Sequence, residues 1–279
     1  MQRYPVAAAV SVAAVLRGPR RLAVVAAVTD QAVYLDTGDR ERPAVCLVTP
    51  GAVRVPCALV LGGGAALPRL AVGDTGLIGG GELALAGVAY RPARWWRPAR
   101  PRTAAVAAFL AAKPLADPPA LLPPLDAGTA QAVAVLSRDL AVGAPLAPAV
   151  AALLGRGPGL TPLGDDVLAG ALVALVAAAS PAAPRLAAET LHQAPHRTTF
   201  VSAALLRHAA RGECVPELAA FVAGRPRATE ALLRVGHTSG AGLAHGVIAA
   251  RPAIREVRSA GAGSAAKRTP AVASRGRTL

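Results

Sequence analysis

The sequence predicts an α+β protein in which a small β barrel or sandwich, an all-helical domain and a disordered basic tail follow one another. Three observations predict this order. Short apolar runs separated by turn residues fill the first hundred residues. Apolar runs of helical length that end at Gly or Pro follow from Thr103 onward. The last stretch is rich in Arg, Gly, Ala and Ser and has no apolar periodicity. We therefore expect domains at 1–100 and 101–250 and a disordered tail at 251–279.

The composition allows a large core built from small side chains. The chain has 279 residues, of which 53% are hydrophobic and only 3% aromatic. Ala, Val and Leu must therefore fill the interior. No apolar run reaches the roughly 20 residues of a membrane-spanning helix. The N-terminal run at 6–16 has a thin positive region before it and arginines after it, which argues against a signal peptide.

The strands expected in the first domain are bounded by turn signals. The triplets Gly62–Gly64 and Gly79–Gly81 fit turns and bulges better than phosphate-binding loops, because neither opens a convincing helix. The expected strand segments lie at 21–28, 32–35, 44–64 and 76–90.

The segment "RPARWWRPARPR", residues 91–102, is dominated by Pro and Arg, and we expect it to be a linker. Trp95 and Trp96 would pin this linker to one of the domains, and stacking on a nucleotide is the weaker alternative.

The second domain is expected to be entirely helical. Its apolar runs are separated by Gly, Pro or polar residues. The expected helices lie at 103–113, 127–143, 144–155, 165–180, 183–193, 198–212, 215–224, 228–236 and 240–250.

The chain carries a formal net charge of +14, and the tail contributes seven Lys or Arg against one Glu. The arginines are scattered, and no aromatic residues are interleaved with them for base stacking. This pattern argues against nucleic-acid binding and for a general attraction of small anions.

Cys46, Cys57 and Cys214 are odd in number and widely spaced, and they show no metal-ligand spacing. They indicate a cytoplasmic protein with reduced thiols. Cys46 and Cys57 could pair, but buried small hydrophobic residues explain them better.

The first candidate site is "GRGPGLTPLGDD", residues 155–166. Gly155 can end the preceding helix, and Gly157 and Gly159 permit positive φ, so that successive amides can form an anion-binding nest. Thr161 adds a hydroxyl, and Gly164 precedes a helix whose N-terminus carries partial positive charge.

Asp165 and Asp166 follow directly. Each could cap the helix, orient the amide group of a substrate or act in catalysis. No cofactor is required by the pattern, and Mg²⁺ held by these two carboxylates is the one metal we consider.

The second candidate site is "HRTTFVS", which places Arg197, Thr198, Thr199 and Ser202 at a helix start. An Arg with hydroxyls suits an oxyanion, and the alternative is a capped helix with a surface Arg.

The third candidate site holds His237, Thr238, Ser239 and Gly240 ahead of another helix. His237 could act as a general acid or base, or could be structural. If the three stretches converge, they form one polar pocket in an Ala- and Leu-rich protein.

In their order, the motifs "GRGPGLTPLGDDVLAG", "TTFVSAALLRHAARGE" and "GHTSGAGLAHG" resemble a bacterial family long labelled a domain of unknown function. This family includes the third subunit of oxamate carbamoyltransferase, which acts in anaerobic allantoin breakdown. The resemblance covers about residues 150–247.

The resemblance implies a transferase subunit that works with an acyl-CoA-synthetase-like subunit and a second helical subunit. It also implies a small anionic substrate, such as carbamoyl phosphate, oxamate or a related carboxylate or phosphate. The alternative is a non-catalytic regulatory or scaffolding subunit that binds a small anion.

Overall fold

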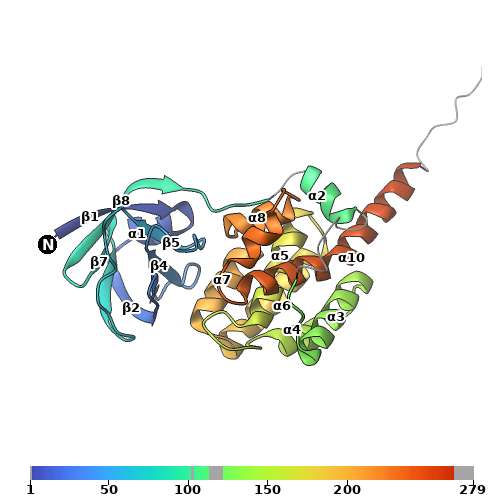
Figure 1. Cartoon of the computed structure of the whole chain (residues 1–279), viewed down its shortest axis with the longest axis horizontal. Coiled ribbons are helices and arrows are strands. Elements are labelled where there is room, and N and C mark those ends of the chain that lie inside the picture. The colour runs from blue at the N-terminus through green and yellow to red at the C-terminus, as the bar shows by residue number, and fades with distance from the viewer. Residues whose placement is uncertain (1, 102–103, 113–121, 267–279) are drawn as a thin grey trace, which may run out of the picture.

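The computed structural model describes residues 2–101, 104–112 and 122–266. A β barrel lies at one end of the molecule and a group of helices at the other (Figure 1). This arrangement confirms the predicted α+β class, with all the strands preceding the nine helices α2–α10.

The barrel is closed and has the strand order β1-β5-β4-β3-β2-β6-β7-β8. The pairs β1–β8 and β4–β5 are parallel, and the other neighbours are antiparallel. Closure removes the unpaired edges that an open sheet would expose. The strands are β1 (Gln2–Ala9), β2 (Arg21–Val28), β3 (Ala32–Asp36), β4 (Ala44–Val48), β5 (Ala58–Leu61), β6 (Thr75–Gly79), β7 (Glu82–Leu85) and β8 (Val88–Trp96), and the short helix α1 (Ala13–Arg17) lies between β1 and β2.

The second glycine triplet forms the turn between β6 and β7, as predicted. The Gly80 and Gly81 amides donate to the carbonyls of Gly18 and Leu16 at the end of α1. A Cβ on Gly79 would lie 2.4 Å from the carbonyl oxygen of Pro19, so no larger residue fits there. These amides bind the chain itself and hold α1 against the barrel.

The predicted linker at 91–102 is wrong over its first half, because β8 extends through Trp95 and Trp96. Both tryptophans pair with the end of β1. The Trp96 indole donates to the carbonyl of Ala7 at 3.3 Å, and the Arg17 guanidinium lies 4.8 Å from the centroid of Trp95. The tryptophans therefore belong to the barrel, and a shorter connection follows them.

That connection is attached to the helical region. Ala99 forms an isolated β-bridge with Cys214, and Arg100 pairs with the buried carboxylate of Glu213. Arg211 reaches back to Glu41 in the barrel at 3.3 Å.

The helices agree with the runs expected from the sequence, except at the end of the chain. The last one continues to Ala266, where the sequence predicts a disordered tail from residue 251; residues 267–279 lie outside the described residues. The helices are α2 (Ala104–Ala111), α3 (Ala127–Val142), α4 (Ala147–Leu153), α5 (Leu163–Ala177), α6 (Ala182–Arg197), α7 (Phe200–Ala210), α8 (Pro216–Val222), α9 (Ala228–Leu233) and α10 (Ser239–Ala266).

Helix α5 is the centre of the helical region and is buried along most of its length. It packs most closely against α10, where glycines let the two backbones approach. A Cβ on Gly170 would lie 2.0 Å from the carbonyl oxygen of Leu243, and one on Gly246 would lie 2.0 Å from that of Val167. A Cβ on Gly242 would likewise lie 2.7 Å from the Cβ of Asp166.

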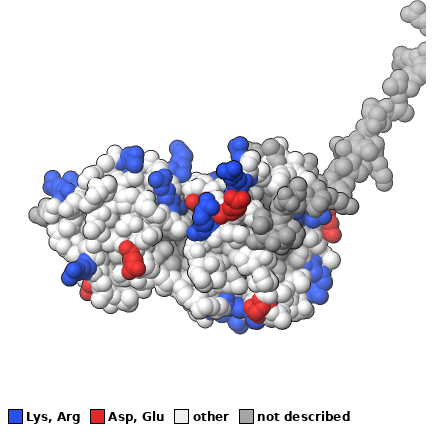
Figure 2. Space-filling view, viewed as in Figure 1, with Lys and Arg blue, Asp and Glu red and all other residues white. Residues whose placement is uncertain are grey.

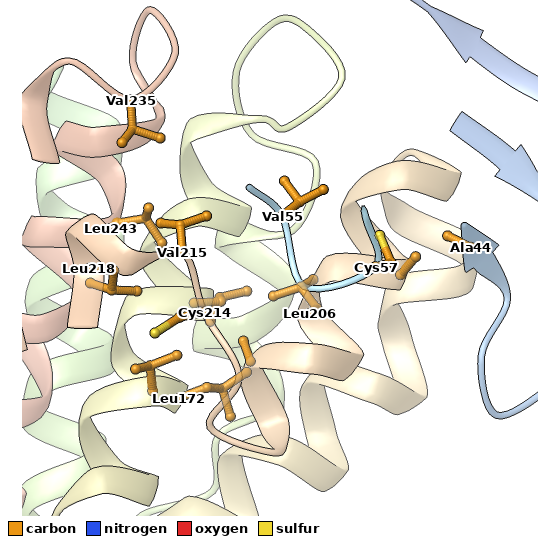
Figure 3. Packing of buried hydrophobic residues seen from close by; sticks show 14 of the residues in the cluster. Ala44, Val55, Cys57, Leu172, Leu206, Cys214, Val215, Leu218, Val235 and Leu243 are labelled. Carbon is orange, nitrogen blue, oxygen red and sulfur yellow. The ribbon is translucent and has the colours of Figure 1, made fainter. Parts of the chain in front are cut away.

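The core consists mainly of Ala, Val and Leu, as the composition predicts, and it continues from the barrel into the helices. Val55 from the barrel faces Leu206 and Val215 of the helical region (Figure 3). Cys46, Cys57 and Cys214 are free and buried, which confirms their interpretation as small hydrophobic residues.

Gly246→Ala should destabilise the protein although Ala favours helices by about 1 kcal/mol over Gly. The added methyl group meets the backbone of α5, which cannot move without separating the two helices. We expect a loss of about 1–3 kcal/mol in the free energy of unfolding, measured by urea denaturation.

Gly51→Ala is the matched control, because nothing lies within 4 Å of its Cβ position and its φ is not positive. Equal stability of the two variants would contradict the close helix crossing.

Candidate functional site

Residues 155–162 connect α4 to α5 and fold back over the start of α5. Gly155, Gly157 and Gly159 have φ values of 73°, 111° and 94°, the positive values that the sequence predicts for this stretch. Gly155 follows Leu154, the C-cap of α4, and is therefore the C′ residue of this helix, as predicted.

Part of the predicted anion-binding nest is occupied by the chain itself. The Gly164 amide donates to the Arg156 carbonyl at 2.9 Å, and the amides of Asp165 and Asp166 donate to the Pro162 carbonyl at 3.0 and 3.2 Å. Gly164 also provides room for the backbone, since a Cβ there would lie 2.0 Å from the carbonyl oxygen of Leu153. These amides stabilise the start of α5.

Asp165 connects the first stretch to the second. Its side chain is 1% exposed. One carboxylate oxygen accepts the Gly155 amide at 2.8 Å, and the other accepts the Thr198 hydroxyl. Neither aspartate caps α5 with its side chain, because the N-cap residue is Pro162. Asp165 therefore holds the α4–α5 loop against the junction of α6 and α7.

Asp166 is buried in a different environment. It is 8% exposed, and its Oδ2 atom has no hydrogen-bond partner. Burial raises the pKa of Asp166 to about 8; a hydrogen bond with Ser239 lowers it, and the neighbouring carboxyl of Asp165 raises it further. Asp166 is therefore a carboxylic acid that gains or loses its proton near neutral pH.

The third stretch reaches the first through Ser239. Its hydroxyl lies 2.9 Å from that of Thr161. Gly240 is buried, and a Cβ there would lie 1.9 Å from the carbonyl oxygen of Leu232, so it serves close packing. The side chains of His237 and Thr238 are exposed.

The second stretch contains a capped helix start, which was the plainer interpretation of its sequence. Thr199 accepts the Ser202 amide at 3.0 Å and donates its hydroxyl to the Leu160 carbonyl. Ser202 is buried at 3% exposure, and Arg197 is exposed at the end of α6.

The three stretches thus meet around the start of α5, and a pocket opens beside them. Among the predicted site residues, only Thr161, Asp166 and Ser239 line it. The pocket also has walls that the sequence analysis did not predict. Tyr34, Val53, Val55 and Pro56 come from the barrel, and Glu213 comes from the loop after α7. No local motif marks these residues, because they meet the helices only through the tertiary fold.

The residues do not fit the Mg²⁺ site that we considered. Both oxygens of Asp165 accept hydrogen bonds from the chain, so that Asp166 alone would face a metal ion. Within residues 2–101, 104–112 and 122–266 there is no group of three His, Cys, Asp or Glu side chains that could hold one.

The surface charge is dispersed. On the face shown in Figure 2, Lys and Arg side chains are spread over both the barrel and the helical region, with acidic side chains beside several of them. No helix in the described part of the chain is long and apolar enough to cross a membrane.

These helices and loops carry the motifs on which the family resemblance depends, and a comparison with protein families supports it. The family model of the oxamate carbamoyltransferase subunit AllH matches residues 153–251. The match begins at the end of α4 and includes all three of the polar stretches described above. No curated protein and no solved structure matches the chain.

Asp166→Asn should remove a pH dependence of stability. The folded protein keeps the Asp166 proton up to a pH of about 8, whereas the unfolded chain releases it near the ordinary value of 3.8. Between these values the free energy of unfolding falls as pH rises, by about 1.4 kcal/mol per pH unit, and above them the contribution is constant. The Asn variant should therefore gain stability relative to the wild type between about pH 5 and pH 8 in urea denaturation.

Asp30→Asn removes an exposed carboxylate and serves as the control. Its free energy of unfolding should differ from that of the wild type by the same amount at every pH between about 5 and 8. A flat difference for Asp166→Asn as well would show that Asp166 is ionised in the folded protein at neutral pH.

Asp165→Ala should lower the free energy of unfolding by about 1–3 kcal/mol, because the Gly155 amide and the Thr198 hydroxyl lose their acceptors. Thermal and urea denaturation measure this loss against Asp30→Ala. Unchanged stability would mean that the α4–α5 loop is held by other contacts.

Proposed function

We propose that the chain is a subunit of an oxamate carbamoyltransferase-like enzyme and acts in a complex with an acyl-CoA-synthetase-like subunit and a second helical subunit. One observation carries this proposal: the AllH family model spans the segment in which the three predicted stretches lie. The structure brings these stretches together through the Asp165–Thr198 and Thr161–Ser239 contacts.

A small anionic substrate, such as carbamoyl phosphate or oxamate, would bind with its charged group on the exposed side of these stretches and its uncharged amide end toward Asp166. Arg197 is exposed there, and its planar guanidinium suits a carboxylate or phosphate. Further polar groups come from the His237 imidazole, the Thr238 hydroxyl and the amides of the exposed Gly157–Gly159 segment. Because the first amides of α5 are bonded within the chain, side chains and loop amides would supply most of the contacts.

Asp166 would serve the reaction as a proton-transfer group or as an acceptor for a substrate N–H. A pKa of about 8 matches proton exchange near neutral pH, and general acid–base groups of this kind contribute about 100-fold or more to turnover. Asp165 would act as a positioning residue, since both of its oxygens hold the protein chain.

A regulatory subunit is the second candidate, and one observation favours it. The pocket next to the three stretches is lined by no Lys, Arg or His among the described residues, and most of its walls are apolar. Such a pocket is sufficient for a subunit that binds a ligand without catalysing its reaction.

Reconstitution of the complex tests the proposal. Omitting this chain should abolish the oxamate-dependent consumption of carbamoyl phosphate. Asp166→Asn should lower the rate of this consumption about 100-fold while the complex still assembles. Arg197→Ala should raise the KM for the anionic substrate more than kcat falls, because it removes binding that the ground and transition states share.

Asp30→Asn is again the control for both readouts. Full turnover with Asp166→Asn in an assembled complex would exclude the catalytic role and favour the regulatory one. Failure of the chain to bind the other two subunits would exclude the subunit assignment.

A further inference from the structure

The pocket is lined by residues of both the barrel and the helices, and Figure 1 shows where these two parts meet. One wall comes from the barrel through Tyr34, Val53, Val55 and Pro56, and the opposite wall comes from the helical region. Val55 on the barrel side and Val215 on the helical side both line the pocket, and Figure 3 shows these two side chains in the buried cluster at this junction. A molecule in the pocket would touch both parts of the protein.

Most of the lining is apolar, and its polar groups are few. The helical wall contributes Val173, Leu205, Leu218, Val235 and Leu243. The polar side chains of the lining are three with hydroxyl groups, Tyr34, Thr161 and Ser239, and two with carboxyl groups, Asp166 and Glu213. The lining therefore offers a large apolar surface with a few polar groups, the usual composition of a small-molecule site.

The two carboxyl groups differ in what they can offer a ligand. Glu213 already pairs with Arg100 and lies 2.6 Å from the ring nitrogen of His208. Although burial raises the pKa of Glu213, these partners lower it overall, so the group is an anion. Asp166 has a buried Oδ2 atom with no partner, and a buried polar atom in this state costs free energy until something bonds to it.

We propose that this pocket binds an uncharged molecule with a primary amide head and a short apolar body, the amide bonding to Asp166 and the body packing between the barrel and the helices. A primary amide presents one N–H donor and one carbonyl acceptor side by side. A protonated carboxyl group presents the complementary O–H donor and carbonyl acceptor, so that the two form a paired set of hydrogen bonds. Asp166, with its raised pKa, is in that form at neutral pH.

Anions are excluded from the same position. Among the described residues, the lining includes no Lys, Arg or His that would balance a negative charge beside Asp166. The ligand class therefore differs from the small anion expected on the exposed side of the three stretches. The site also assigns a role to the barrel, which lies outside the segment that the AllH family model matches.

Ligand-observed NMR on the isolated full-length chain at neutral pH tests this inference. The probes are cyclohexanecarboxamide, cyclohexanecarboxylate and cyclohexylammonium, which share one apolar body. The amide should bind saturably, and the carboxylate and the ammonium should each bind at least about tenfold more weakly. Equal or tighter binding of either charged probe would overturn the proposal, as would a failure of the amide to bind.

Variants locate the bound amide. Asp166→Leu should weaken amide binding at least about tenfold, whereas Asp166→Asn, whose own amide can pair in the same way, should keep it within about threefold. Val53→Trp should weaken binding by filling the mouth of the pocket from the barrel side, and Val72→Trp, at a side chain that is 69% exposed, should not. Unchanged binding in both Asp166→Leu and Val53→Trp would show that the amide binds elsewhere.

The inference stands apart from the subunit assignment, because this assay needs neither partner subunits nor turnover. Intact amide binding with an inactive complex would overturn only the proposed function. Lost amide specificity with an active complex would overturn only this inference. The Asp166→Asn variant separates the two directly, since it should bind the amide and fail to support turnover.

Discussion

The close crossing of α5 and α10 is the constraint on which the candidate site depends. The two backbones are in direct contact at three glycines, Gly170 on α5 and Gly242 and Gly246 on α10. A Cβ at any of these positions would collide with a carbonyl or a side chain of the other helix. This approach places Ser239, the first residue of α10, beside Asp166 and shields that carboxyl from water. The raised pKa of Asp166 is thus a consequence of helix packing.

Adjacent positions on a helix point about 100° apart, and the two aspartates show what this difference can do. Asp165 turns toward the α4–α5 loop and the end of α6, where the Gly155 amide and the Thr198 hydroxyl satisfy it. Asp166 turns toward α10 and the pocket, where one oxygen is left without a partner. The first residue holds two segments of the fold together, and the second keeps one buried oxygen without a hydrogen-bond partner.

The sequence predicted the fold class and the run of helices, because local patterns determine these features. It marked the three polar stretches, but their meeting depends on tertiary contacts. It could not separate the uses of the glycines. Gly164 and Gly240 look like parts of an anion nest, yet each makes room for a carbonyl of another segment. The strand at Trp95 and Trp96 was also missed, because its Pro- and Arg-rich surroundings suggest a linker. Its pairing partner is β1, which is distant in the sequence. The barrel wall of the pocket depends on tertiary contacts for the same reason.

Glu213 shows why the barrel and the pocket have to be considered together. Its carboxylate binds Arg100, which follows the last strand of the barrel, and His208 on α7, and it also lines the pocket. The neighbouring Cys214 pairs with Ala99 of the same connection. One short segment therefore attaches the barrel to the helices and also supplies part of the pocket wall. A ligand that touches both walls favours the arrangement in which these contacts are formed, because binding stabilises the state that it fits.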